Sequence, residues 1–431
     1  MPQPSTTLNS SRFLFFLYYY PPQASTASKR NQLISSEIQK RISFSKIFTS
    51  SHNKPESNDS GNNDVEYITT YDYRYFLKKK SKEGSLREEQ KESKAMQFLV
   101  KFINTFPLSI IIGEGGLVYF LSMVRKGHRA IRENNITHIY SSFRPFADHY
   151  AAYILKRRNP ELYWIADFRD LIIDPHYNHI FFSAGQRSFL KRIFRYANLL
   201  TTVSNGLAEH LKEYNGNVIT LRNGIKNIPD QLTPQHCKYF KIAYTGSMFL
   251  DKRNPEPLFI ALNELISDNL IKRDEARIVY AGKDSSYWSE LAGKYELDAI
   301  FVDKGIVLYE ESVAIQKSAC INLLLTISSA QLQGVLTGKM IEYFESGSPI
   351  LAIVVNQKDP ELSRILDELE IGRSFSDQKK DYEGIKEFVY NEYVHWKNTG
   401  MNRKPVDLDQ LRKKYSIEKT MRPLFEKIFS P

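Results

Sequence analysis

Short apolar runs, rich in β-branched and aromatic residues, alternate with amphipathic stretches along most of the chain. The runs cover residues 12–17, 42–49, 137–141, 162–166, 199–203 and 218–221, and the rhythm restarts at 241–244, 277–280, 320–326 and 349–354. Continuous apolar runs are typical of parallel strands that are covered on both faces. The alternation therefore predicts an α/β protein with two units of right-handed βαβ repeats, each around a parallel sheet.

Two polar segments interrupt this rhythm. Residues 227–235 are polar and punctuated by proline, which predicts a linker between a first domain over 1–228 and a second over 236–415. Residues 50–95 are rich in Ser, Asn, Asp and Lys, which predicts a flexible insertion around one strand at 65–70. A final amphipathic helix is expected over 416–431.

Positive charge is concentrated in the first half of the chain. Of the 431 residues, 1–230 carry 32 Lys and Arg against 20 Asp and Glu, whereas 231–431 carry 27 against 29. This asymmetry indicates an anionic partner for the first domain. No nucleic-acid motif accompanies the basic residues, so nucleic acid is not the expected partner. Two cysteines without a CxxC spacing favour the reducing cytoplasm.

Two apolar stretches need to be distinguished from membrane segments. Residues 13–20 are too few to span a bilayer, and prolines stand where a signal peptide would have its cleavage site. Residues 106–124 include Pro107, Glu114 and three glycines, which disfavours a transmembrane helix. We expect a buried core helix there, with an interfacial segment beside lipid headgroups as the alternative.

Candidate chemistry in the first domain lies where predicted strands end. It consists of Tyr20, Pro21 and Pro22 in one loop, and of Asp167, Arg169 and Asp170 in another. A strand that runs into a small-residue turn and a helix start is typical of a phosphate- or sugar-facing loop. Carboxylates at a strand end can accept protons or stabilise an oxocarbenium-like charge. A structural Asp–Arg pair is the alternative interpretation.

The second domain carries candidate residues for binding a diphosphate: Gly246, Ser247, Lys252, Arg253, Lys339 and Glu342. Small residues after a strand let the backbone approach a ligand, and basic side chains can hold phosphates. A solvated basic pair is the alternative interpretation of Lys252 and Arg253. Lys339 stands at a predicted helix start, and Glu342, one turn later, can accept hydrogen bonds from ribose hydroxyls. No G-x-G-x-x-G or Walker A motif is present, so we expect no dinucleotide, and we also expect no metal.

Taken in order, several of these segments resemble the retaining glycosyltransferases of family 4. The likeness is carried by residues 18–22, 141–145, 167–170, 202–204, 222–224, 244–247 and 337–349. It implies a GT-B fold, with two Rossmann-like doubly wound domains facing each other across a cleft and a C-terminal helix that packs back onto the first domain. It also implies that Glu342 matches the second glutamate of an E-x7-E motif, whose first position is here Gly334. His149 is the candidate replacement for the family's catalytic histidine.

The resemblance implies a cytoplasmic enzyme, or one peripheral on the inner face of the cytoplasmic membrane. It would transfer a sugar from a nucleotide-diphosphate sugar to a glycan or lipid-diphosphate-linked acceptor, with retention of configuration and no cofactor. The excess of positive charge predicts that the first domain docks on an anionic membrane surface. An epimerase or hydrolase of the same fold and a non-catalytic partner subunit remain as alternatives.

Overall fold

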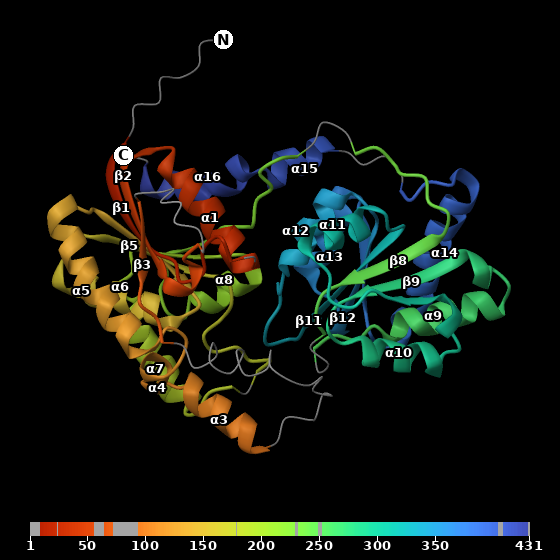
Figure 1. Ribbon diagram of the computed structural model, residues 1–431, viewed down its shortest axis with the longest axis horizontal. Helices are drawn as coiled ribbons and strands as arrows, with labels where there is room; N and C mark the ends of the chain where they lie inside the picture. The colour runs from red at the N-terminus through yellow and green to blue at the C-terminus, as the bar shows by residue number, and fades with distance from the viewer. Residues whose placement is uncertain are drawn as a thin grey trace, which may run out of the picture. The chain divides into compact units, whose positions relative to one another are not determined.

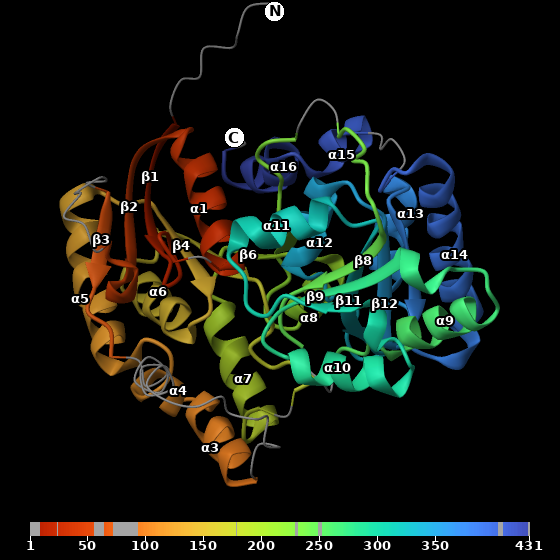
Figure 2. The ribbon, with the colours of Figure 1, turned by 45° about the vertical axis from the view of Figure 1, so that its right-hand side comes forward.

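The computed structural model describes residues 9–23, 25–55, 64–71, 94–177, 179–228, 232–248, 252–403 and 408–429. The chain forms two compact units (Figure 1). Unit 1 comprises Met1–Arg222 and Met421–Pro431, and unit 2 comprises Asn223–Thr420. In each unit, helices pack on both faces of one parallel sheet (Figure 2). Along the chain, the boundaries between the units lie at 222/223 and 420/421, whereas the sequence pattern predicts them at 228/236 and 415/416.

The sheet of unit 1 has the strand order β3-β2-β1-β4-β5-β6-β7. Its strands are β1 (Asn9–Phe16), β2 (Ile42–Ser50), β3 (Val65–Ile68), β4 (His138–Phe143), β5 (Tyr163–Phe168), β6 (Leu199–Thr202) and β7 (Val218–Thr220). Its helices are α1 (Thr26–Gln39), α3 (Lys94–Asn104), α4 (Leu108–Ile111), α5 (Gly116–Asn134), α6 (Phe146–Arg158), α7 (Ser183–Phe194) and α8 (Asn205–Leu211). A 3₁₀ turn, η1, covers Ser51–Asn53.

The sheet of unit 2 has the order β10-β9-β8-β11-β12-β13. Its strands are β8 (Phe240–Thr245), β9 (Ala276–Ala281), β10 (Phe301–Asp303), β11 (Ile321–Ser328), β12 (Ile350–Asn356) and β13 (Gly372–Ser376). Its helices are α9 (Glu256–Ser267), α10 (Ser285–Lys294), α11 (Tyr309–Lys317), α12 (Gly338–Ser346), α13 (Pro360–Leu369), α14 (Tyr382–Thr399) and α15 (Leu408–Tyr415). Three 3₁₀ turns are η2 (Arg273–Glu275), η3 (Asp298–Ile300) and η4 (Lys379–Asp381), and α16 (Ile417–Ile428) begins in unit 2 and continues into unit 1.

All the predicted strands are present, and burial explains why they could be recognised. Every residue of β11 is buried, and Phe13 to Leu17 in and after β1 are completely inaccessible. Strands covered on both faces carry apolar side chains at consecutive positions instead of alternate ones. The strands that the pattern did not predict, β10 and β13, are short edge strands with exposed or partly exposed polar residues.

In both sheets the strand order reverses beside the first strand of the unit. The reversal lies between β1 and β4 in unit 1 and between β8 and β11 in unit 2. Loops after strands diverge at such a point, and doubly wound proteins bind ligands there, at the carboxyl ends of the strands. The described loops at these points are 17–23 and 143–146 in unit 1, and 246–248 and 329–338 in unit 2.

The apolar stretch 106–124 is not the single core helix that the pattern favoured. It contains α4, a turn through Gly113 and Gly115, and the first turns of α5. At Gly113 a Cβ would lie 2.2 Å from the Ser109 carbonyl oxygen, and Gly115 has a φ of +89°, so glycine is required to break the helix here. Within the described part of the chain, no helix is both long and apolar enough for a membrane crossing.

The predicted flexible insertion at 50–95 lies largely outside the described residues, since 56–63 and 72–93 are not among them. Its central strand is confirmed: β3 pairs in parallel with β2, with Val65 opposite Ile47.

Candidate functional site

The turn after β8 brings the backbone of Gly246 against the side chain of Lys339. Gly246 has a φ of +129°, and a Cβ at this position would lie 2.5 Å from Nζ of Lys339. Its N–H donates to the Ala281 carbonyl at 2.6 Å. Glycine is therefore required both by the backbone conformation and by the approach of the lysine. Lys339, in the first turn of α12, is held directly over the end of β8.

Arg253 and two tyrosines brace this turn from the core. Tyr244 donates its hydroxyl hydrogen to the Ser247 carbonyl at 3.0 Å, and Tyr280 donates to the Gly246 carbonyl at 3.2 Å. Both tyrosine rings stack on Trp288, with centroid separations of 5.3 and 4.9 Å. Arg253 donates to the Ser247 carbonyl and to the Tyr244 hydroxyl, so its guanidinium supports the turn after β8 that holds the predicted diphosphate-binding residues Gly246 and Ser247. Lys252, beside it, is half-buried.

Glu342 is connected to the end of β8 through Gln316, which comes from α11. The Gln316 side-chain amide donates to the Thr245 hydroxyl at 2.9 Å and lies 3.4 Å from Oε2 of Glu342. Gln316 is 1% exposed. The structure thus brings together Gly246, Ser247, Arg253, Lys339 and Glu342 at one edge of the sheet. No pattern in the sequence pointed to Gln316.

Two hydroxyls at this edge are buried without a hydrogen-bond partner among the described residues. Ser328 is the last residue of β11 and is completely buried, and Thr337 is the N-cap residue of α12 but makes no side-chain capping bond. Most buried side-chain polar atoms in proteins do have partners. Together with the N–H groups in the first turn of the nine-residue helix α12, these hydroxyls offer a polar ligand several hydrogen bonds.

Gly334, where the resemblance expects the first glutamate, has a structural role in the loop before α12. Its φ is +72°, and its N–H donates to Oδ2 of Asp359 at 2.6 Å. The other oxygen of Asp359 accepts from the N–H groups of Glu361 and Leu362 and so caps α13. One buried carboxylate therefore joins the loop before α12 to the start of α13.

In unit 1, Asp167 forms a buried ion pair, but its partner is Arg30 of α1 and not the nearby Arg169. The Arg30 guanidinium donates two bonds to the carboxylate, at 2.7 and 3.1 Å, and the Thr201 hydroxyl donates a third at 2.6 Å. Burial alone would raise the pKa of Asp167, but the Arg30 charge and these donors hold it below its ordinary value. These contacts favour the alternative interpretation of Asp167 as part of a structural Asp–Arg pair, with Arg30 as the arginine. Arg169 instead pairs at the surface with Asp170, at 3.1 Å.

His149 is completely buried on α6. Its Nδ1 lies 2.8 Å from the Ser141 hydroxyl, and its ring contacts Phe168 and Phe194. Burial lowers its pKa to about 3, a shift that the neighbouring Asp167 charge only partly opposes. The imidazole is therefore neutral at physiological pH and is enclosed by aromatic side chains.

The loop after β1 is supported from beneath by Asp148. This carboxylate accepts the Tyr18 N–H at 3.0 Å and the Tyr119 hydroxyl at 2.7 Å. Complete burial, reinforced by the Glu114 charge, raises the pKa of Asp148 to about 7, although the two donors oppose the shift. The residues of the predicted phosphate- or sugar-facing loop follow: the Tyr20 hydroxyl lies 3.5 Å from the Ser35 hydroxyl, Pro21 is half-buried and Pro22 is exposed.

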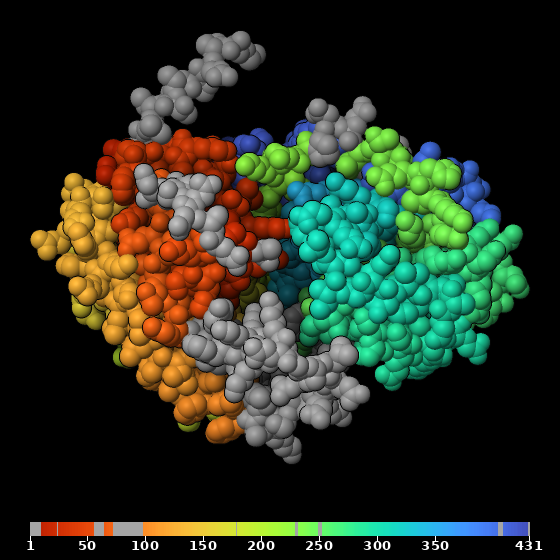
Figure 3. Space-filling view, in the orientation of Figure 1, coloured from red at the N-terminus to blue at the C-terminus, as the bar shows by residue number. Residues whose placement is uncertain are grey.

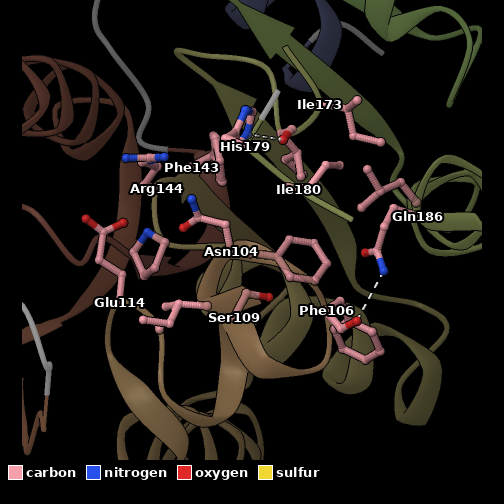
Figure 4. Close-up of a pocket in the computed structure, with 16 residues that line it drawn as sticks. Asn104, Phe106, Ser109, Glu114, Phe143, Arg144, Ile173, His179, Ile180 and Gln186 are labelled. Atoms are coloured by element: carbon pink, nitrogen blue, oxygen red, sulfur yellow. Dashed lines mark hydrogen bonds between the residues drawn. The ribbon is translucent and has the colours of Figure 1, made fainter. Parts of the chain in front are cut away.

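A cavity of about 60 Å³ opens at the same edge of the sheet of unit 1 (Figure 4). Its polar lining includes Asn104, Ser109, Glu114 and Arg144, with His179 beside Ile180 and Gln186 near Phe106. Glu114 also accepts the Tyr19 hydroxyl at 2.5 Å, which connects the cavity to the loop after β1. Its lining comes from distant segments of the chain, so no local motif could have predicted it.

Among the described residues, no group of three or more His, Cys, Asp or Glu side chains is arranged to bind a metal ion.

Known structures share the fold of the whole chain. Sucrose-phosphate synthase from Thermosynechococcus elongatus is 12% identical, with a TM-score of 0.58 over 97% of this chain and 99% of that one. The lipopolysaccharide outer core galactosyltransferase WaaB is 11% identical, with a TM-score of 0.57 over 97% and 99%. S. aureus TarM, solved in a complex that includes UDP, is 10% identical, with a TM-score of 0.55 over 98% and 100%. No known protein family and no curated protein sequence matches the chain. The chain thus has the GT-B fold.

Replacing Asp167 by Asn should destabilise unit 1 by about 3–5 kcal/mol, because the Arg30 charge would stay buried without its counter-ion. Urea unfolding measures the change. The matched control is Asp170→Asn, which removes an exposed partner of Arg169 and should cost less than about 1 kcal/mol. Equal effects of the two substitutions would refute the structural assignment of Asp167.

Asp148→Asn should change how stability depends on pH. The folded pKa of Asp148, about 7, exceeds the ordinary value of 3.8, so between these values the folded chain retains a proton that the unfolded chain has lost. This carboxyl therefore makes the wild type less stable as pH rises from about 4 to about 7, and the variant lacks that loss. Unfolding free energies across this range should diverge in favour of the variant, and a constant difference would contradict the assignment.

Proposed function

We propose that the chain is a glycosyltransferase that moves a sugar from a nucleotide-diphosphate sugar to a glycan or lipid-linked acceptor. The observation that carries the proposal is the contact between Lys339 and Gly246. It places an amine, a glycine turn and a helix N-terminus together at the strand reversal of unit 2. Doubly wound folds bind nucleotides at this location. The GT-B fold, and the UDP present in the TarM complex, support the same interpretation.

Charge development in glycosyl transfer accounts for these residues. When the bond between the sugar and the diphosphate breaks, negative charge accumulates on the leaving diphosphate. The ammonium of Lys339 and the N–H groups at the start of α12 would stabilise that charge, as fixed donors do at developing oxyanions. The hydroxyls of Ser328 and Thr337 would add hydrogen bonds. Glu342, one turn along α12, would accept from the ribose hydroxyls.

We further propose that transfer retains the anomeric configuration and needs no metal, since cationic and N–H donors supply the charge that a metal would otherwise provide. Unit 1 would then bind the acceptor at its carboxyl edge, where the loop of Tyr20 to Pro22 and the cavity with Arg144 lie. The excess of positive charge over residues 1–230 supports a cytoplasmic enzyme that works at an anionic membrane surface.

Nucleotide binding gives the direct test. Lys339→Ala should weaken binding of the matching nucleoside diphosphate about tenfold or more, because a charge-assisted hydrogen bond contributes about 1.5–3 kcal/mol. Glu342→Ala should also weaken it, through loss of the ribose contact. Isothermal titration calorimetry with each common nucleoside diphosphate measures these affinities.

Lys294→Ala is the matched control. This exposed lysine is the last residue of α10 and pairs with Glu256 of α9, so its loss should not affect nucleotide binding. Wild-type protein that binds no nucleoside diphosphate would refute the proposed function, as would equal affinities of the Lys339 and Lys294 variants.

Product analysis separates the reaction from its alternatives. With acceptor extract and a donor that binds, we expect sugar transfer with unchanged anomeric configuration, detected by NMR, and equal rates with and without a chelator. Interconversion of donors without acceptor would identify an epimerase, and sugar released to water would identify a hydrolase. Binding without any turnover would identify a partner subunit, and an inverted product would refute retention.

A further inference from the structure

Eight large apolar side chains are exposed on three consecutive helices of unit 1. They are Phe98, Leu99 and Phe102 of α3, Ile111 and Ile112 at the end of α4, and Leu117, Val118 and Leu121 of α5. Between 41 and 61% of each side chain is accessible. α4 packs against both α3 and α5, so the three helices form one continuous region, here called the apolar face. Part of its orange surface is visible at the lower edge of unit 1 in Figure 3.

Soluble proteins rarely expose contiguous apolar surface of this kind without a partner for it. The exposed residues do not belong to helices that fail to pack on the core, because the same helices also bury apolar side chains. Ile103, Ile110, Tyr119 and Phe120 are all buried against unit 1. The helices therefore have an inward apolar face and a second, outward one.

The charge around the apolar face indicates the partner. Residues 94–129 contain five basic residues and one acidic residue, Glu114, which is buried and bonded to Tyr19. Along α5, side chains four apart share a face, and that face changes from Leu117 and Leu121 to Arg125 and Arg129. An apolar tip followed by a basic band matches the acyl and phosphate layers of an anionic bilayer.

A second copy of the chain fits this face poorly. Two such faces placed band to band would bring the Arg125 side chains of both copies together, and the carboxylates beside the band, Glu66 and Glu133, are already paired within the chain. Lys126 and Arg129 already have acidic partners, Glu66 and Glu133, whereas no ion pair occupies Arg125 in the described part of the chain.

We propose that the apolar face inserts into the headgroup region of an anionic lipid bilayer. The inference rests on the proposed function for its purpose, which is access to a lipid-linked acceptor. α3 and α4 support that purpose, because Ile103, Asn104 and Ser109 on these helices also line the cavity of unit 1 (Figure 4). Insertion would bring the cavity close to the headgroups. It also adds an apolar anchor to the charge attraction expected from the sequence.

The test is co-sedimentation with vesicles of phosphatidylcholine alone and of phosphatidylcholine mixed with phosphatidylglycerol. Wild-type protein should bind the mixed vesicles, and added salt should weaken this binding but not abolish it, because insertion is not screened. The double variant Leu117→Ser, Leu121→Ser should bind at least tenfold more weakly. Both side chains are exposed, so their loss should leave the fold intact.

Unit 2 offers a matched control in Ile306→Ser, Leu308→Ser, two side chains that are 83 and 76% exposed outside the apolar face. This variant should bind vesicles like the wild type. The proposal is overturned if wild-type protein does not bind mixed vesicles, or if both double variants bind equally. It is also overturned if light scattering shows wild-type dimers that the Leu117/Leu121 variant no longer forms.

Nucleotide calorimetry on the same preparations separates this inference from the proposed function. Loss of vesicle binding with unchanged nucleotide affinity is the expected behaviour of the Leu117/Leu121 variant. A wild-type chain that binds nucleotide but not vesicles refutes only the membrane inference, and one that binds vesicles but no nucleotide refutes only the proposed function.

Discussion

A parallel sheet covered on both faces leaves its polar chemistry at the ends of its strands. In this chain the central strands are largely buried, so a charged side chain in their buried part needs a buried partner, as Asp167 has in Arg30. Polar groups that are to meet a ligand must instead lie in the loops beyond the carboxyl ends. The turn after β8, the start of α12, the loop after β1 and the cavity with Arg144 all occur there. The location of both candidate sites thus follows from how the strands are buried.

The two edges differ in the chemistry they offer. The edge of unit 2 combines Lys339, the N–H groups in the first turn of α12 and two hydroxyls that have no partner among the described residues, which suits a polyanion. The edge of unit 1 combines Arg144, Glu114, two amides and a hydroxyl with apolar side chains, which suits a ligand that is only partly polar. Two ligands of unlike polarity are what a transfer reaction between a nucleotide donor and a lipid-linked acceptor requires.

Much of the fold could be predicted because burial on both faces marks each central strand independently of its neighbours. Two candidate residues near the strand ends could also be named from the sequence: Gly246 from a small residue after an apolar run, and Lys339 from a basic residue at a predicted helix start. Contacts between distant segments could not. Arg30 lies 137 positions from Asp167, and Gln316 lies 71 from Thr245, so no spacing reveals either pair. The glycines before α5 were visible in the sequence, but the pattern favoured one core helix and did not predict the break. The outward side of α3 depends on which face packs inward.

The aromatic stack behind the turn after β8 has a consequence for the energetics of binding. Tyr244 and Tyr280 stack on the same indole, and their hydroxyls hold two successive carbonyls, those of Ser247 and Gly246. Three rigid rings thus fix the turn from the core side before any ligand arrives. A nucleotide meeting this turn would find its shape already set, so little of the binding free energy would be spent on ordering the loop.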